Sequence, residues 1–170
     1  MQITPRIAPC LWFDSQAEEA AAFYVSVFKN SKITSVAKYT AAGQQTHKQR
    51  PGSAMTVAFE LDGQPFTALN AGPVFKFNEA VSFQVSCSNQ EEVDYYWDKL
   101  SKGGDPKAQQ CGWLKDKFGL SWQVVPATLP KLLSAHESPT AERAMDAMLR
   151  MKKIDIRELE RAVAGEPVAS

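Results

Sequence analysis

The sequence predicts an α+β fold made of two copies of a βαβββ module followed by a short group of helices. The same order of strand and helix signals occurs twice, each first helix begins near an S-x-x-E sequence, and strand-type patterns follow each helix. The length of 170 residues favours one domain over 1–170. Within it we expect module one at about 5–72, module two at about 79–126 and a helical tail at about 128–165.

The first module opens with a strand over about 7–13 and continues with a helix to about Phe28. Ser15 and Glu18 have the spacing of a capping box, which predicts where this helix starts. Its apolar residues recur every three or four positions, so one side must pack against a sheet. The later strands, with a hairpin turn at Asp62-Gly63 between the last two, are expected at about 32–39, 54–61 and 64–70.

The second module repeats this beginning with a strand over about 81–87 and a helix to about Ser101. Ser88 and Glu91 repeat the capping spacing, and the pair Tyr96-Trp97 stands as far after Ser88 as Phe23-Tyr24 stands after Ser15. A shared offset of this kind favours duplication of one unit. The remaining strands, the first of them weak, are expected near 107–110, 112–115 and 120–126.

Two segments differ from the repeat. The polar stretch 40–53 is predicted to be a long mobile loop of the kind that often flanks a site. After residue 126 the pattern turns helical, at about 129–134, 139–150 and 155–164, with Ser138 and Pro139 as a good N-cap and N1 pair. This tail is expected to pack on the body or on a second subunit.

Composition excludes several classes of partner. Nineteen basic residues balance nineteen acidic ones, and no stripe of Lys and Arg is present, so nucleic acid is not expected to bind. No apolar run reaches membrane-spanning length and the N-terminus has no secretory pattern, which predicts a cytoplasmic protein without a membrane partner. Cys10, Cys87 and Cys111 fit no disulfide or metal spacing and are expected to be reduced thiols.

Several short segments carry a resemblance to a known family. They are Leu11-Trp12-Phe13-Asp14, the stretches 67–73 and 82–85, Phe75-Lys76-Phe77, and the run 111–119 with its Asp-x-x-Gly turn. With the duplicated module, they resemble the vicinal oxygen chelate superfamily of glyoxalase I, extradiol dioxygenases and bleomycin-resistance proteins. The closer similarity is to its PhnB-like branch, often labelled 3-demethylubiquinone-9 3-methyltransferase-like. The resemblance spans nearly the whole chain and implies a curved mixed sheet around a cavity, in a homodimer.

The resemblance also locates the positions that hold a metal in other branches. They fall on Pro9, Ala68, Ser82 and Gln123, and none of these is a good ligand. We therefore expect no metal and no cofactor. The chain's two histidines, His47 and His136, are expected to be solvated surface residues.

The methyltransferase label is not expected to describe the activity. A typical S-adenosylmethionine enzyme has a glycine-rich turn after its first strand, in a doubly wound sheet. Here no G-x-G sequence occurs, and the first helix is followed by strands rather than by alternating strands and helices.

Alternation along the strands predicts which side chains face the cavity, because residues two apart share a face. With parity taken from the four carried-over positions, and Trp113 added for its capacity to stack, the expected ligand-binding set is Leu11, Phe13, Phe66, Asn70, Ser82, Gln84, Trp113 and Gln123. Its mixed apolar and amide character suits a neutral aromatic or heterocyclic ligand.

Cys111 and Asp116 are the candidate catalytic residues. A nucleophilic thiol needs a base or a positive field nearby, so an inert cysteine is the favoured interpretation, and Asp116 is favoured as a turn former. The leading hypothesis is a protein that binds a small molecule without metal. The alternatives are an enzyme acting on a small aromatic or quinone-like substrate, and a metal-dependent lyase or dioxygenase.

Overall fold

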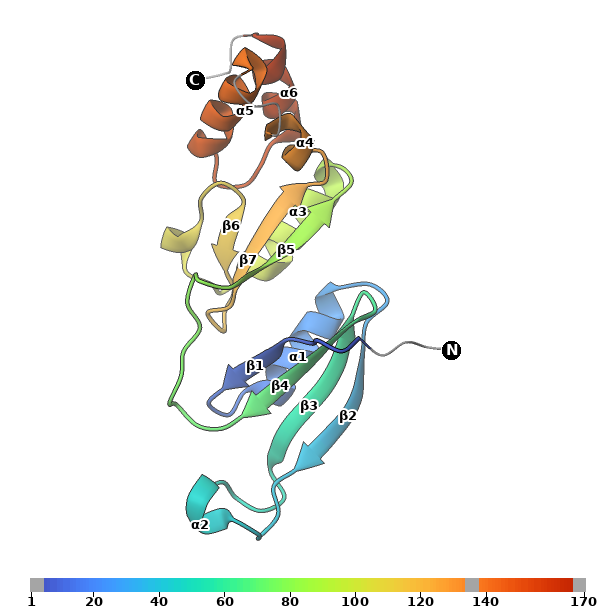
Figure 1. The fold of residues 1–170 in the computed structure, drawn as a ribbon, viewed down its shortest axis with the longest axis vertical. Helices are drawn as coiled ribbons and strands as arrows, with labels where there is room; N and C mark the ends of the chain where they lie inside the picture. Colours follow the sequence, from blue (N-terminus) through green and yellow to red (C-terminus); the bar gives the residue numbers. More distant parts are fainter. Residues whose placement is uncertain (1–4, 134–137, 167–170) are drawn as a thin grey trace. The chain divides into compact units, whose positions relative to one another are not determined.

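The computed structural model describes residues 5–133 and 138–166. The chain divides into two compact units, Met1–Phe77 and Asn78–Ser170 (Figure 1). Their boundary falls in the segment that separates the two modules predicted from the sequence. The organisation of these units as one domain stays a prediction.

The first unit is a mixed four-stranded sheet with one long helix. Its strands follow the order β1-β4-β3-β2, with β1 parallel to β4 and the other neighbours antiparallel. The helix α1 contacts β2, β3 and β4 (Figure 1). The elements are β1 (Cys10–Phe13), α1 (Ala17–Val27), β2 (Lys32–Lys38), α2 (Gln44–His47), β3 (Ala54–Leu61) and β4 (Gln64–Asn70).

The second unit has a three-stranded mixed sheet in the order β5-β7-β6, with α3 against it. Its elements are β5 (Ser82–Cys87), α3 (Gln90–Ser101), η1 (Pro106–Ala108), β6 (Trp113–Lys115) and β7 (Ser121–Pro126), followed by α4 (Leu129–Leu133), α5 (Pro139–Arg150) and α6 (Ile156–Ala164). The α+β class is confirmed, with the strands distributed over two mixed sheets.

The strand predicted near 107–110 was wrong. Pro106 begins the short 3-10 helix η1, and the Asp105 carboxylate caps it by accepting a hydrogen bond from Lys107 N at 2.9 Å. Gln110 alone makes an isolated bridge, with Trp113. Proline at the first position and a capping carboxylate before it favour a helical turn over an extended strand.

A ladder of apolar side chains holds α1 to the first sheet. Tyr24 on α1 stacks on Phe59 at 6.3 Å between ring centroids, and Phe59 stacks on Phe66 at 5.4 Å. All three are buried, with Leu11, Val57 and Ala68 on the same face of the sheet. Burial of this set stabilises the unit, at about 1.5–3 kcal/mol for each large side chain.

Both helices begin one residue later than the predicted capping boxes. The N-cap of α1 is Gln16, which makes no side-chain cap, and the capping box at Ser15 and Glu18 was wrong. The N-cap of α3 is Asn89, which accepts a hydrogen bond from Glu92 N at 3.0 Å, while the Glu92 carboxylate accepts one from Ser88 N at 2.7 Å. In α3 the reciprocal capping is therefore present, but displaced from Ser88 and Glu91.

Asn70 replaces the missing cap of α1. Its Oδ1 accepts a hydrogen bond from Ala17 N at 2.8 Å, and its Nδ2 donates to Ala54 O at 3.1 Å. The Tyr39 hydroxyl donates to the Asn70 carbonyl at 2.5 Å. This buried side chain, at the end of β4, thus connects the start of α1 with the start of β3.

The loop 40–53 is organised around His47. The imidazole packs against the Tyr39 ring at 4.6 Å, and its Nδ1 accepts a hydrogen bond from Gln49 N at 3.0 Å. His47 is half-buried and its Nε2 lies 3.2 Å from Ala42 O at an exposed position, so it is a surface residue, as predicted, that also packs on Tyr39. His136 lies outside the described residues.

The C-terminal helices belong to the second unit. The predicted cap is confirmed, since Ser138 Oγ accepts a hydrogen bond from Ala141 N at 3.1 Å. The helices share an apolar core that includes Ile154 and Leu159 and reaches Val125 on β7. Gln90 on α3 donates to Ile154 O at 3.1 Å and accepts from Ile156 N at 2.9 Å, so the prediction that the tail packs on the body is confirmed. Among the described helices, none has the length and apolar character needed to cross a membrane.

Replacing Asn70 with Ala is expected to destabilise the first unit by about 2–4 kcal/mol, because two buried backbone groups lose their hydrogen-bond partner. The matched variant Asn89→Ala removes a solvent-exposed cap and is expected to cost about 1 kcal/mol. Urea unfolding followed by circular dichroism measures both. Equal losses in the two variants would contradict a special role for Asn70.

Candidate ligand-binding face

The second sheet has one face covered by α3, whereas the opposite face meets the core of the C-terminal helices at Val125. Val85, Trp122 and Val124 lie on the covered face and are 8%, 3% and 0% exposed. Alternation then assigns the other residues of these strands to the opposite face. That face, called here the open face of the second sheet, carries Ser82, Gln84, Ser86, Trp113, Lys115, Ser121, Gln123 and Val125.

A row of hydrogen-bonded polar side chains crosses this open face. Gln84 Nε2 donates to Gln123 Oε1 at 3.3 Å, and Gln123 Nε2 donates to Ser82 Oγ at 2.8 Å. Gln84 is exposed, while Ser82 and Gln123 are half-buried. The row is electrically neutral, and within the described residues the Ser82 hydroxyl hydrogen has no recorded acceptor.

Two further groups border this row on β6. Trp113 stands opposite Gln123 and Lys115 stands opposite Ser121 in the antiparallel register. The Trp113 ring is half-buried, and Lys115 forms an ion pair with Glu79. The open face therefore combines amides, hydroxyls, one indole and one ammonium group, which can bind a small polar molecule.

In the first unit the predicted cavity residues lie on the wrong face. Leu11, Phe13, Phe66 and Asn70 are 5%, 3%, 7% and 6% exposed and share the face of the sheet that packs against α1. The apolar surface of α1 has to be covered, and these side chains cover it. They were predicted to face the cavity because they share parity with the carried-over positions Pro9 and Ala68, and that assignment of the face was wrong.

The sequence held a signal that would have corrected this error. The two-residue turn at Asp62-Gly63 pairs Phe59 with Phe66 and Val57 with Ala68. Val57, Phe59 and Leu61 form the apolar set of β3, so their partners on β4 must face the helix as well. The opposite face of the first sheet carries residues that were missed, and among them Trp12 donates its indole N–H to Gly72 O at 2.8 Å.

The four positions that hold a metal in other branches do not form a metal site here. Ala68 is fully buried on the helix-covered face and offers no donor atom. Pro9 O is engaged by Thr67 N at 3.0 Å, and Ser82 and Gln123 bond to each other. Within residues 5–133 and 138–166, no three His, Cys, Asp or Glu side chains gather in a way that could hold a metal ion.

Cys111 lies in a turn attached to the C-terminal tail. Its N–H donates to Met151 O, and the Gly112 N–H donates to Lys152 O, both at 2.8 Å. Burial raises the pKa of the Cys111 thiol. A raised pKa lowers the thiolate fraction, so this environment does not activate a nucleophile.

Asp116 is buried and its carboxylate is used inside the fold. Oδ1 accepts hydrogen bonds from Phe118 N at 2.8 Å and Leu120 N at 3.1 Å, and Oδ2 accepts from the Trp122 indole at 2.9 Å. These contacts build the Asp-x-x-Gly turn and connect it to the covered face of the sheet. Asp116 thus lies on the opposite side of β7 from the polar row.

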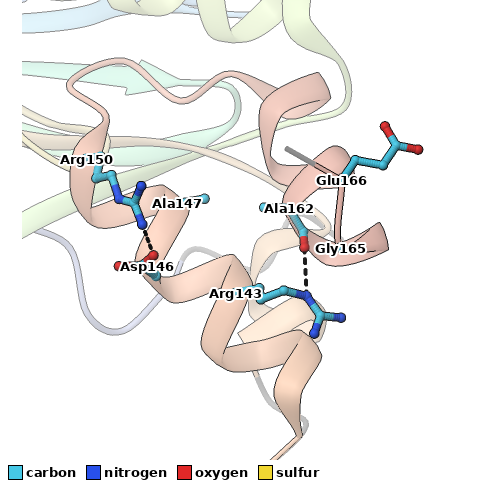
Figure 2. A pocket seen from close by; sticks show the side chains of 7 residues that line it. All are labelled: Arg143, Asp146, Ala147, Arg150, Ala162, Gly165 and Glu166. Atoms are coloured by element: carbon cyan, nitrogen blue, oxygen red, sulfur yellow. Dashed lines mark hydrogen bonds and ion pairs between the residues drawn. The ribbon is translucent and has the colours of Figure 1, made fainter. Parts of the chain in front are cut away.

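A separate groove runs between α5 and α6 in the tail. It encloses about 200 Å³ and is lined by Arg143, Asp146, Ala147, Arg150, Ala162, Gly165 and Glu166. Figure 2 shows that both arginines are already engaged: Arg143 donates to Ala162 O at 2.9 Å and Arg150 pairs with Asp146. Its volume is below that of most small-molecule sites, and its arginines serve the helices themselves.

The two mixed sheets, each with one helix-covered face, define a glyoxalase-type protein of the vicinal oxygen chelate superfamily. Within that class, the chain belongs to the 3-demethylubiquinone-9 3-methyltransferase family, whose model matches residues 5–125. No curated protein matches the chain.

Solved structures support the same assignment. A PhnB protein from Bacillus cereus is 34% identical, with a TM-score of 0.61, over 72% of this chain and 100% of that one. The Pseudomonas aeruginosa protein PA1353 is 17% identical, with a TM-score of 0.54, over 72% of this chain and 98% of that one. The fosfomycin resistance protein FosX from Listeria monocytogenes, solved with Mn(II) and sulfate, is 15% identical, with a TM-score of 0.51, over 80% of this chain and 100% of that one. The last two share the fold alone.

The thiol of Cys111 is expected to react with iodoacetamide more slowly than free cysteine at about pH 8, because the thiolate is the nucleophile. Cys87, whose pKa burial and the nearby Glu92 raise to about 11, is expected to react more slowly still. Peptide mass spectrometry after timed alkylation measures each rate. A Cys111 rate that reaches its plateau below about pH 8 would contradict this expectation and restore the thiol as a candidate nucleophile.

Proposed function

We propose that this protein binds a small aromatic or heterocyclic molecule, without metal, on the open face of the second sheet. The observation that carries the proposal is the row of hydrogen bonds from Gln84 through Gln123 to Ser82. The row is accessible to solvent, and a ligand with matched donors and acceptors can replace the water that it contacts.

Side-chain chemistry supports the choice of ligand. Amides present a donor and an acceptor in one plane, which suits the edge of a planar ring carrying oxygen or nitrogen. Trp113, opposite Gln123, offers a flat apolar surface for such a ring. Binding without metal is supported by the donor set, since Ser82 and Gln123 are neutral and bonded to each other.

Binding is favoured over catalysis by the surroundings of the two catalytic candidates. The Cys111 thiol has a raised pKa, and the Asp116 carboxylate accepts three hydrogen bonds within the fold. The family name describes a methyl transfer to a quinone-like substrate. However, the strand-to-helix turns at 14–16 and 88–89 contain no glycine, so neither brings backbone close to a cofactor as the turn of a doubly wound methyltransferase does.

A thermal-shift screen of neutral aromatic and heterocyclic compounds is expected to yield ligands whose affinity depends on Gln123. The variant Gln123→Met keeps the side-chain volume and removes its hydrogen bonds, so affinity is expected to fall about tenfold, the equivalent of about 1.4 kcal/mol. Gln45→Met, at an exposed position of α2 in the first unit, is the control and should leave affinity unchanged. Isothermal titration gives the affinities. Ligands that bind Gln123→Met as tightly as the unaltered protein, or only when a divalent metal is added, would overturn the proposal.

We also propose a cytoplasmic homodimer. The edge strand β2 supports a second chain as partner, because it leaves Ile33 and Val36 each 42% exposed.

Light scattering coupled to size exclusion is expected to give twice the chain mass of 18.8 kDa. The variant Val36→Asp should shift the protein towards monomer if β2 lies in the interface. A monomeric mass for the unaltered protein at micromolar concentration would contradict the dimer.

A further inference from the structure

Lys115 is held on the open face by an acid from outside the sheet. Its ammonium group pairs with the carboxylate of Glu79, which lies in the segment before β5. The Lys115 side chain is 24% exposed and that of Glu79 is 63% exposed. The hydrogen bond from Lys115 lowers the pKa of Glu79, so the acid stays ionised at neutral pH. A half-buried cation is thus neutralised by a carboxylate that can return to solvent at little cost.

Ser121, the direct neighbour of Lys115, makes no side-chain hydrogen bond within residues 5–133 and 138–166. Within the described residues, Ser121 Oγ is the one buried side-chain nitrogen or oxygen without a recorded partner, and the residue is 1% exposed. Lys115 and Ser121 stand opposite each other on β6 and β7, which brings their Cβ atoms to about 4.5–5.5 Å. A buried hydroxyl without a partner lowers the stability of the fold. Both groups are donors, so one acceptor oxygen between them would satisfy both.

An aromatic surface lies two residues away on the same strand. Trp113 and Lys115 share the open face of β6, and Trp113 is paired with Gln123. Residues two apart on a strand are separated by about 6.5–7 Å. In an aromatic carboxylate the carboxylate oxygens lie about 3.7 Å from the ring centre, and a hydrogen bond of about 2.8 Å places the donor nitrogen about 6.5 Å from that centre. The face therefore presents a ring surface and an anion contact at the spacing of one small molecule.

We infer that the ligand of this open face is an aromatic carboxylate, and that Glu79 occupies its anion contact in the free protein. The inference rests on the proposed function, because it names the class of molecule that the same face binds. The ligand's carboxylate accepts hydrogen bonds from Lys115 Nζ and Ser121 Oγ, and its ring lies against Trp113. In the free protein Glu79 competes for Lys115, and the bound ligand displaces Glu79 into solvent. A single ammonium group matches a monoanion better than a phosphate dianion.

The test compares benzoate with benzamide, which has the same shape and no charge. Both are titrated into ¹⁵N-labelled protein, with amide shifts of β6 and β7 as the readout. Glu79→Gln removes the competing charge and is expected to raise the affinity for benzoate about three- to fivefold, which corresponds to the strength of an exposed ion pair. Lys115→Met is expected to weaken benzoate about tenfold or more, since hydrogen bonds to charged groups are the strong ones. Benzamide should change less than twofold in either variant.

Asp94→Asn is the matched control. It removes the carboxylate of another ion pair of the same unit, between Asp94 and Lys153, and should leave benzoate affinity unchanged. Ser121→Ala is expected to weaken the binding of benzoate without loss of stability, because its hydroxyl bonds to no other group in the part of the chain that the structure describes.

The inference is overturned if Glu79→Gln does not raise the affinity for benzoate, or if it raises the affinity for benzamide as much. Inorganic phosphate that binds more tightly than benzoate at the same amides would replace the aromatic carboxylate with a phosphate ligand. If the affinity for benzamide depends on Gln123 while the affinity for benzoate does not depend on Lys115, the proposed anion contact is wrong and the proposed function still holds. If ligands from the neutral screen prove independent of Gln123, the proposed function fails on its own experiment.

Discussion

Each sheet of this protein has to bury one face under a helix, and the other features of its structure follow from that constraint. The apolar side chains of α1 and α3 exclude water only if the strands supply an apolar surface opposite them. Because side chains alternate along a strand, the residues that cover the apolar side of the helix determine which residues lie on the other face. In the second sheet, Trp122 and Val124 meet α3, so Ser121 and Gln123 must face away from it. The composition of the candidate site is therefore a consequence of core packing.

Two buried polar residues make this arrangement specific. Asn70 closes the first unit by capping α1 from the end of β4, and Asp116 closes the second by holding the turn that leads into β7. Each satisfies backbone N–H groups that would otherwise be buried without partners. Both were candidates for function when only the sequence was considered. Their complete hydrogen bonding shows how a structural role can resemble a functional one, because buried polar side chains are rare in either case.

The open face of the second sheet has the opposite character, since its polar groups are only partly satisfied. The Gln84, Gln123 and Ser82 row is internally bonded, but the Ser121 hydroxyl beside it has no recorded partner among the described residues. Lys115 is neutralised by an acid that is mostly in solvent. At Ser82 and Gln123, two of the four carried-over positions, this face presents a hydroxyl and an amide in place of a His or carboxylate side chain.

The sequence by itself determined the α+β class, the two modules, nearly all strands and helices, and the absence of metal-ligand residue types at the four family positions. These follow from local patterns, namely periodicity, turn dipeptides and residue chemistry, which do not depend on distant contacts. The predicted cap of the first helix was wrong, because the N–H of Ala17 is capped by Asn70, which lies 53 positions further along the chain.

Only the tertiary structure decided which side chains face the site. The parity taken from Pro9 and Ala68 assigned Leu11, Phe13 and Phe66 to the cavity, whereas in the structure they lie on the helix-covered face. Because side chains alternate along a strand with a period of two, an error of one residue moves every side chain to the other face. The same parity was right for Gln84 and Gln123, where apolar Trp122 and Val124 marked the helix side. The partnership of Lys115 with Glu79, and the isolation of Ser121, depend on how strands and the preceding segment meet in space. No local sequence pattern predicts how close these segments lie in the folded chain.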